Sequence, residues 1–297
     1  MYRVHFGLRE PPFGLTPDTA FAFSGASHQE ALNVLLLASA SGEGFIKITG
    51  DVGMGKTLLC RRFLSTLADD SVAAYIPNPM LDLRGLLLAI ADELGAGVDR
   101  QADQHHLIKN VNHALLRCAR QNKRVIIFID EAQALPIETL EALRLLSNLE
   151  TEKRKLVQVV MFGQPELDQT LAQPSIRQLN QRIAFQHRLS GLSADETSQY
   201  VSHRLRVAGY AGEQLFTGGA LAALYKHTGG VPRLVNIVAH KSLLAAYGEG
   251  TARVSRRHVQ RAACDTPAAI RVTNPLFGGL ALVSAAFAGV AAWLYVA

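Results

Sequence analysis

The chain has 297 residues, of which 48% are hydrophobic and 19% are charged, so it can form a packed core and is not a disordered protein. Its formal net charge is +5, but the Lys and Arg residues are scattered along the chain, which argues against a nucleic-acid-binding protein with a concentrated basic stripe. Three widely spaced cysteines, Cys60, Cys118 and Cys264, indicate a reducing compartment and no disulfide framework.

The first part of the chain, residues 1–43, is expected to contain an N-terminal linker and a first helix. The next segment, 45–49, alternates apolar and polar residues, as a half-buried strand does. A helix is predicted after it, because apolar residues recur at helical spacing at Leu58, Leu59, Phe63, Leu64 and Leu67.

A glycine-rich loop joins this strand and this helix, and residues 50–57 fit G-x-x-x-x-G-K-[ST] at every fixed position. In such a loop the backbone N–H groups surround phosphate oxygens, the lysine reaches the β- and γ-phosphates, and the Ser or Thr hydroxyl binds Mg²⁺. The sequence therefore predicts a site for ATP and Mg²⁺, with Lys56 catalytic and Thr57 a metal ligand, lined by Gly50, Asp51, Val52, Gly53, Met54, Gly55, Lys56, Thr57 and Leu58.

A pair of carboxylates follows a second apolar strand, 125–129. Five apolar residues in a row are typical of a strand buried on both faces of a parallel sheet. We expect Asp130 to hold Mg²⁺ and Glu131 to accept a proton from, or orient, the attacking water. The alternative is a solvated strand-to-helix turn in which Glu131 caps the next helix.

Further strands are predicted at 71–76 and 156–162, with a possible fifth at 182–189, and helical patterns separate them. Strands that alternate with helices predict a parallel sheet covered by helices on both faces, the α/β architecture of P-loop NTPases. Ligands of such sheets bind beyond the carboxyl ends of the strands. The nucleotide-binding core is expected to span residues 44–190.

After this core only helical patterns occur, near 194–208, 217–227, 232–247 and 255–264. They predict a small all-α lid over residues 191–265, with a capping box at Ser193–Glu196. The residues 266–275 are expected to form a juxtamembrane linker.

Residues 276–296 contain no charge and predict a C-terminal transmembrane helix. Because arginines precede it, the positive-inside rule predicts a single-pass protein of the inner (cytoplasmic) membrane with its ATP site in the cytoplasm. The alternative is an apolar helix buried within the soluble domain. Four arginines are candidates for contact with inner-membrane lipid, although a solvated helix face explains them nearly as well: Arg253, Arg256, Arg257 and Arg261.

These motifs together resemble an AAA+ ATPase, and several stretches narrow the resemblance over about residues 1–270. They resemble the ExeA-like (general secretion pathway protein A) ATPases, with the nearest likeness among ATPases that serve biogenesis of the mannose-sensitive haemagglutinin (MSHA) pilus, a type IV pilus. The stretches concerned are His5–Leu8 with Pro12-Phe13, Thr16–Asp18, Asp130–Gln133, Phe162–Leu167 and Gly230–Arg233.

The resemblance implies further site residues. Gln164 takes the sensor-1 position, and Arg233 the sensor-2 position, where a lid-surface salt bridge is the alternative role. Arg182 matches the arginine finger that acts on a neighbouring subunit, and Arg177 is the second candidate; both alternatively are surface arginines. The resemblance also places the segment 6–23 beside adenine, whereas by composition its aromatic residues suit a hydrophobic core.

The resemblance implies a membrane-anchored AAA+ ATPase that hydrolyses ATP to assemble or remodel a type IV pilus or type II secretion-like complex. Its expected partners are further copies of itself in an ATP-dependent homo-oligomer, for which a hexamer is one candidate, and membrane-embedded pilus or secretion components. One alternative is a nucleotide-gated scaffold with incidental turnover. Another is a DNA-dependent helper ATPase of the transposition type, against which the scattered basic residues argue.

Overall fold

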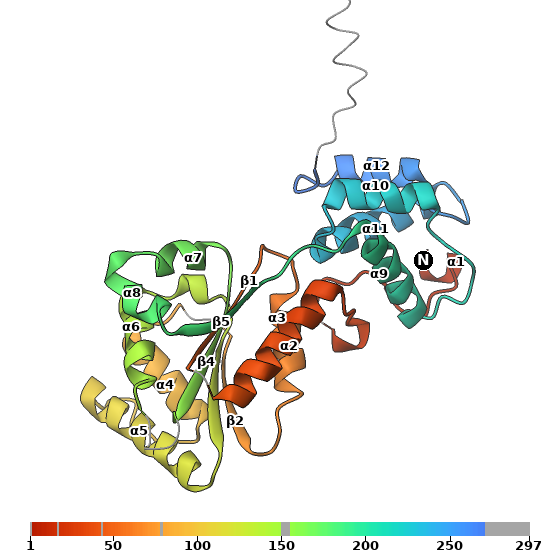
Figure 1. The fold of residues 1–297 in the computed structure, drawn as a ribbon. Helices are drawn as coiled ribbons and strands as arrows, with labels where there is room; N and C mark the ends of the chain where they lie inside the picture. The colour runs from red at the N-terminus through yellow and green to blue at the C-terminus, as the bar shows by residue number, and fades with distance from the viewer. Residues whose placement is uncertain (1, 17, 43, 78–79, 150–154, 271–297) are drawn as a thin grey trace, which may run out of the picture.

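The computed structural model describes residues 2–16, 18–42, 44–77, 80–149 and 155–270, which form two units joined by a narrow connection (Figure 1). One unit is an α/β core built around a sheet, and the other is a helical lid. The predicted α/β P-loop architecture with a following all-α lid is therefore present in the structure.

The sheet of the core has five parallel strands in the order β2-β3-β4-β1-β5. Because β4 lies between β3 and β1, the loops that follow these three strands meet at one edge of the sheet. The predicted fifth strand is present and lies at the edge beside β1. The strands are β1 (Phe45–Thr49), β2 (Ser71–Ile76), β3 (Arg124–Ile129), β4 (Val157–Gly163) and β5 (Ile183–Arg188).

The strand β1 differs from its expected half-buried form, because all five of its residues are buried. The polar residues of the alternating pattern, Lys47 and Thr49, therefore point into packed protein instead of solvent. The ammonium group of Lys47 donates to the Asp168 carboxylate at 2.6 Å, which supplies the partner that a buried charge requires. The ion pair between Lys47 and Asp168, which are far apart in the sequence, thus allows β1 to be fully buried despite its alternating apolar and polar residues.

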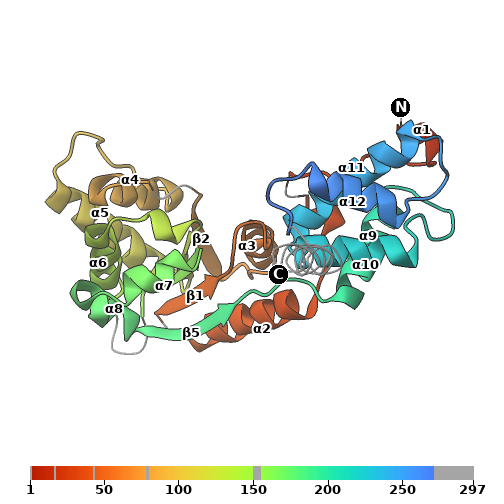
Figure 2. The same ribbon diagram turned by 90° about the horizontal axis from the view of Figure 1, so that it is seen from above.

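Helices cover both faces of the sheet (Figure 2). The helices α2 (Ala26–Ser41) and α3 (Lys56–Leu64) pack on one face, around β1, β3 and β4 side chains that include Ile46, Phe128 and Phe162. The opposite face is covered by α4 (Leu83–Glu93), α5 (Gln104–Arg120) and α6 (Ile137–Leu146). Short elements complete the core, namely η2 (Ala132–Ala134), α7 (Glu166–Leu171), η3 (Pro174–Ile176) and α8 (Arg177–Asn180).

The lid consists of α9 (Ala194–Val207), α10 (Gly218–Thr228), α11 (Pro232–Gly248) and α12 (Arg256–Cys264). The N-terminal segment, with α1 (Tyr2–His5) and η1 (Thr19–Phe21), packs into the same hydrophobic core as these helices. Its contribution to that core comes from four buried side chains, Phe6, Leu8, Phe13 and Phe21. The chain therefore begins in the lid, then forms α2 on the core, and returns to the lid after β5 (Figure 1).

The predicted localisation as a single-pass inner-membrane protein needs correction. Within the described ranges, no helix is long and apolar enough to cross a bilayer. The 17-residue helices α5 and α11 would measure only about 26 Å, shorter than the ~30 Å hydrocarbon layer. The predicted transmembrane helix, residues 276–296, lies outside the described residues.

Candidate nucleotide-binding site

The glycine-rich loop, residues 50–57, connects β1 to α3 as the sequence predicts. Gly53 and Gly55 have φ angles of 84° and 88°, in the left-handed region that favours glycine, and Gly55 is the N-cap of α3. The helix N-terminus therefore points its unsatisfied N–H groups and its positive dipole end toward the loop. This geometry is a ready anion-binding site.

Lys56 is buried in this loop and its ammonium group is turned back onto loop carbonyls. It donates to the carbonyl oxygens of Gly50 at 2.7 Å and Asp51 at 3.2 Å. Burial lowers the pKa of Lys56, against the opposing charges of Glu131, Asp130 and others. Bound phosphate oxygens would supply the negative partner that this buried ammonium group otherwise finds only in carbonyl dipoles.

The predicted metal ligands Thr57 and Asp130 are brought into direct contact. The Thr57 hydroxyl donates to Asp130 Oδ2 at 2.7 Å, and the Tyr75 hydroxyl donates to the same oxygen at 3.5 Å. Burial, followed by the nearby Asp130 charge, raises the pKa of Tyr75 to about 12, so its hydroxyl keeps its proton. A hydroxyl and a carboxylate suit Mg²⁺, which prefers oxygen ligands and takes the remainder from water and phosphate. Within the described part of the chain, no group of three or more His, Cys, Asp or Glu side chains forms a metal site.

Glu131 lies beside this pair, and two glutamine side chains hold its carboxylate. Its Oε2 atom accepts hydrogen bonds from Gln133 Nε2 at 2.6 Å and Gln164 Nε2 at 3.0 Å. The side-chain Oε1 atom of Gln133 in turn accepts from the Gln164 backbone N–H at 2.9 Å. Burial raises the pKa of Glu131, but these two hydrogen bonds and the Lys56 charge outweigh it and lower the pKa overall. The carboxylate therefore stays ionised, as a proton acceptor must be.

The lid touches the glycine-rich loop through its backbone. The Arg233 N–H group, in the first turn of α11, donates to the Gly53 carbonyl at 3.2 Å. A Cβ atom on Gly53 would lie 2.6 Å from Arg233 Cβ, so only glycine permits this approach. The Arg233 side chain is exposed, and Arg233 is one of the residues that line the cavity; its sensor-2 role stays a prediction.

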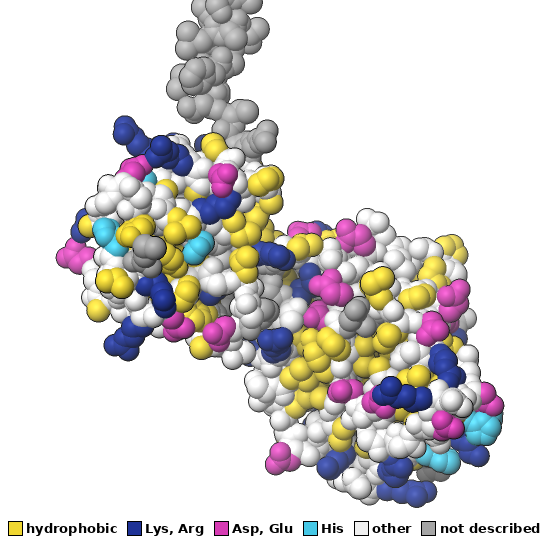
Figure 3. Space-filling model, turned by 180° about the vertical axis from the view of Figure 1, so that it is seen from behind, with side chains coloured by type: hydrophobic (Ala, Val, Ile, Leu, Met, Phe, Trp, Pro, Cys, Tyr) yellow, Lys and Arg dark blue, Asp and Glu magenta, His cyan; other side chains and the backbone are white. Residues whose placement is uncertain are grey.

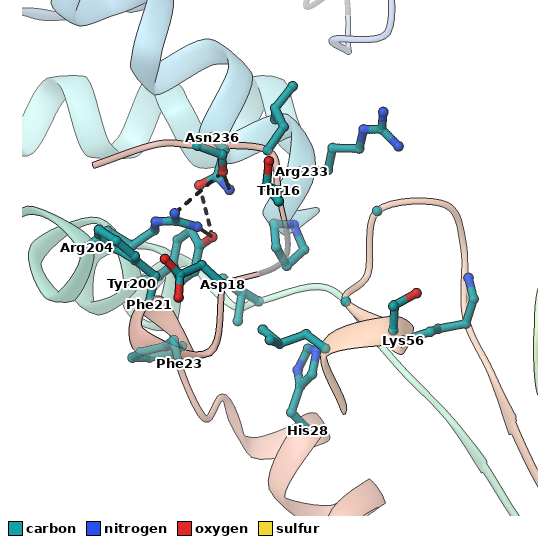
Figure 4. A pocket seen from close by; sticks show the side chains of 18 of the residues that line it. Thr16, Asp18, Phe21, Phe23, His28, Lys56, Tyr200, Arg204, Arg233 and Asn236 are labelled. Atoms are coloured by element: carbon teal, nitrogen blue, oxygen red, sulfur yellow. Dashed lines mark hydrogen bonds between the residues drawn. The ribbon is translucent and has the colours of Figure 1, made fainter. Parts of the chain in front are cut away.

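A cavity of about 350 Å³ lies between the loop, the lid and the N-terminal segment. Figure 4 shows Lys56 at one end of the cavity and a polar group of lid side chains at the other, with Phe21 and Phe23 below that group. Phe21 and Phe23 line the cavity, and Phe21 also belongs to the lid core, whereas Phe13 belongs to the lid core and does not line the cavity. The cavity can hold phosphates at its Lys56 end and a flat ring at its aromatic end.

Four polar residues of this cavity were not predicted from the sequence, namely His28, Tyr200, Arg204 and Asn236. Tyr200 and Arg204 are one helical turn apart on α9, the only local signal that they act together. His28 comes from α2, and its Nε2–H donates to the Met54 carbonyl of the glycine-rich loop at 2.7 Å. Burial lowers the pKa of His28, so it is neutral near pH 7.

The two candidate arginine fingers lie away from this cavity. Arg182 directly precedes β5, whose first residue Ile183 is paired with Phe45, at the opposite end of β1 from the glycine-rich loop. Its guanidinium donates to the Ser147 hydroxyl at 3.0 Å. Arg177 begins α8 in the same region and is exposed. Neither arginine belongs to the site of its own chain.

The lid arginines considered for lipid contact are partly paired within the protein. Arg253 donates to Glu213 at 3.1 Å, and Arg261 donates to Glu249. On the face shown in Figure 3, Lys and Arg side chains are dispersed among acidic ones and do not form a single stripe. These contacts favour the alternative that the arginines form a solvated helix face.

The glycine-rich loop, the acidic pair at the end of β3, Gln164 at the end of β4 and a helical lid together define a P-loop NTPase of the AAA+ class. Residues 39–171 match the family model described as an AAA domain. The chain is 42% identical over 263 residues to general secretion pathway protein A of Aeromonas hydrophila, which covers 89% of this chain and 48% of that protein. The chain therefore belongs to the ExeA-like family of AAA+ proteins, and it spans about half the length of the curated relative that it matches.

Solved structures agree with this fold. The Cdc6p structure from Pyrobaculum aerophilum matches with a TM-score of 0.65 and 18% identity, over 82% of this chain and 70% of that one. The Aeropyrum pernix ORC2 protein, solved as ADPNP–ADP complexes, matches with a TM-score of 0.61 and 16% identity, over 86% and 73% of the two chains. At these identities the likeness concerns the fold alone.

Proposed function

We propose that this protein binds and hydrolyses ATP with Mg²⁺ and uses the lid movement that follows to assemble or remodel a secretion or type IV pilus complex. The observation that carries the proposal is the contact of Thr57 with Asp130 beside Lys56, with Glu131 adjacent. The relative's name, general secretion pathway protein A, supports secretion as the setting. The likeness to pilus ATPases makes type IV pilus biogenesis a second setting within the same proposal.

The residues of the site divide the work of phosphoryl transfer. The backbone N–H groups of residues 50–57 and the Lys56 ammonium bind the triphosphate. Thr57 and Asp130 would hold Mg²⁺, which when bound neutralises phosphate charge. Glu131 takes a proton from the attacking water or orients it, and Gln164 positions that water near the terminal phosphate. Arg233 adds a positive charge from the lid.

A neighbouring copy of the chain would supply the remaining positive charge. Arg177 and Arg182 lie across the sheet from the glycine-rich loop, so either can reach a phosphate only in another subunit. We therefore propose an ATP-dependent homo-oligomer, with Arg182 as the arginine finger and Arg177 as the second candidate. A ring of six is one arrangement that satisfies this requirement. The secretion or pilus components would then contact the oligomer.

The first experiment compares Mg²⁺-dependent ATP hydrolysis by the wild type with Lys56→Ala and Glu131→Gln. Loss of the buried ammonium group should abolish ATP binding and turnover together. Glu131→Gln keeps the shape of the site but removes the proton acceptor, so ATP binding should persist while kcat falls at least about 100-fold. Nucleotide binding measured by calorimetry separates the two effects.

Wild-type turnover no faster than that of Lys56→Ala would refute the proposed hydrolysis. Unchanged kcat in Glu131→Gln would remove Glu131 from its role. Lys109→Ala is a matched control for the loss of a lysine charge, because Lys109 is on α5, away from the loop. Its ATP binding and turnover should equal those of the wild type.

A further inference from the structure

A hydrogen-bonded network joins the N-terminal segment to the lid at the aromatic end of the cavity. The Arg204 guanidinium donates to the Pro12 carbonyl at 2.5 Å, to the Tyr200 hydroxyl at 2.9 Å and to the Gly14 carbonyl at 3.5 Å. The Tyr200 hydroxyl donates to Asn236 Oδ1 at 2.9 Å, and Asn236 Nδ2 donates to the Gly14 carbonyl at 3.4 Å. Three parts of the chain, namely residues 12–14, α9 and α11, are thereby fixed to one another.

The position of Arg204 in this network is unusual for a charged residue. Only 7% of its surface is exposed, and within the described residues it forms no ion pair with a carboxylate. Its partners are backbone carbonyls, the Tyr200 hydroxyl and the Phe21 ring, whose centroid lies 4.7 Å from the guanidinium carbon. A buried guanidinium that is satisfied by carbonyl oxygens holds those carbonyls in fixed positions, because moving them would leave its donors unsatisfied.

Of the two residues whose carbonyls Arg204 holds, Gly14 lines the cavity, and Pro12 lies two residues before it in the same segment. Gly14, Leu15 and Thr16 line the cavity together with Phe21, and the network closes it at the end away from Lys56 (Figure 4). With phosphates bound at the Lys56 end, the base of a nucleotide would extend to this wall. Its ring would meet Phe21 or Phe23, and its polar edge would meet the backbone of residues 14–16.

We propose that Arg204 is a positioning residue for base recognition, which holds the backbone of residues 12–16 in the form that contacts the base of the bound nucleotide. This inference rests on the proposed nucleotide site. Arg204 acts through the carbonyls of Pro12 and Gly14 and not by contact with phosphate. Removal of the Arg204 side chain should therefore weaken the contribution of the base to the binding free energy. The contribution of the triphosphate should stay unchanged.

The test measures the affinities of the wild type and Arg204→Ala for Mg·ATP and for inorganic tripolyphosphate with Mg²⁺, by calorimetry on the full chain. Arg204→Ala should bind ATP about tenfold more weakly, or weaker still, because hydrogen bonds from a charged donor contribute a factor of that order. Tripolyphosphate should bind both proteins equally, since it has no base that could contact residues 14–16. A residue with a merely structural role would change both affinities or neither.

Two further variants keep the test decisive even if Arg204→Ala does not fold. Tyr200→Phe keeps the buried ring but removes the hydroxyl that joins Arg204 to Asn236, so it should weaken ATP binding severalfold with tripolyphosphate unchanged. Arg206→Ala is the matched control, because Arg206 is an exposed arginine on the same helix and does not line this cavity. Arg206→Ala should bind both ligands as the wild type does.

Equal ATP affinity in the wild type, Arg204→Ala and Tyr200→Phe would overturn the inference while leaving the nucleotide site intact. A parallel loss of ATP and tripolyphosphate binding in folded Tyr200→Phe would overturn it as well. A wild type that binds neither ligand would instead refute the proposed function on which the inference rests.

Discussion

At the residue scale, Glu131 combines backbone strain with a fixed side chain. Its φ angle is 53°, in the left-handed region that residues with a side chain seldom occupy. The cost of this conformation, on the order of 1–3 kcal/mol, is offset by the hydrogen bonds that Gln133 and Gln164 make to its carboxylate. Strained backbone conformations of this kind are concentrated at functional sites. Here the strained conformation directs the Glu131 carboxylate toward the glycine-rich loop.

The buried His28 predicts how the stability of the folded protein depends on pH. Because burial lowers its pKa, the unfolded chain takes up a proton on His28 below about pH 6.5 while the folded chain remains neutral there. The stability that His28 contributes is therefore present at neutral pH and is lost as the pH falls below about 6.5. Glutamine at this position can still donate to the Met54 carbonyl but does not titrate.

We expect the melting temperature of His28→Gln to fall less than that of the wild type between about pH 7.5 and pH 5.5. Thermal unfolding followed by circular dichroism at several pH values measures this difference. The exposed His105 provides the control, and His105→Gln should follow the wild type. Parallel curves for His28→Gln and the wild type would show that His28 does not stabilise the fold in its neutral form.

At the scale of elements, one carboxylate caps two helices that belong to different units. Glu196 Oε2 accepts from the Ser193 N–H at the start of α9, completing the capping box that the sequence predicts. Its Oε1 accepts from the Ala26 N–H at 2.7 Å, in the first turn of α2. A residue of the lid thus satisfies the N-terminus of a core helix, which ties the two units together where the chain passes between them.

The double cap predicts an unusually large effect for a partly exposed side chain. Glu196→Ala removes the acceptor of both helix N-termini, and we expect it to lower the free energy of unfolding by about 1–2 kcal/mol. Asp195→Ala is the matched control, because the neighbouring Asp195 lies in the same first turn but is exposed and caps neither helix. Urea unfolding of both variants measures the difference, and equal midpoints would contradict the role of Glu196.

At the scale of the whole molecule, the two ends of the described chain share one hydrophobic core. Phe13 is 3% exposed and meets Phe216 edge to face, with ring centroids 6.0 Å apart. The N-terminal segment therefore completes the lid, and through Arg204 it also forms a wall of the cavity. Any movement of the lid should carry this segment with it.

This packing predicts that a change near the N-terminus destabilises the lid. Phe13→Ala should lower the free energy of unfolding of the lid by about 3–5 kcal/mol, as large-to-small changes in a packed core do. Val4→Ala, in the same segment, should have little effect because Val4 is 88% exposed. Limited proteolysis followed by mass spectrometry locates the cleavage sites. A lid that stays as resistant in Phe13→Ala as in Val4→Ala would show that the segment is not part of its core.

The sequence by itself determined the parts of this protein whose geometry is local. Residues 50–57 form the expected loop because glycines at fixed spacing allow its backbone angles. The apolar run at 125–129 forms the buried strand that carries Asp130 and Glu131 to the sheet edge. The order of strands and helices then defined the fold class, since few topologies accommodate such an alternation.

Only the tertiary structure decided which distant residues complete the site. Arg204 donates to the Pro12 carbonyl although the two residues are 192 positions apart in the sequence. Lys47 pairs with Asp168, which is 121 positions away, and is buried, whereas the alternating pattern of its strand predicted that Lys47 would be exposed to solvent. No local periodicity encodes such pairs, because they depend on how the lid, the N-terminal segment and the sheet pack together. The cavity wall at residues 14–16 and the buried charge of β1 therefore depend on the packing of the whole molecule. The glycine-rich loop, in contrast, depends on eight consecutive residues.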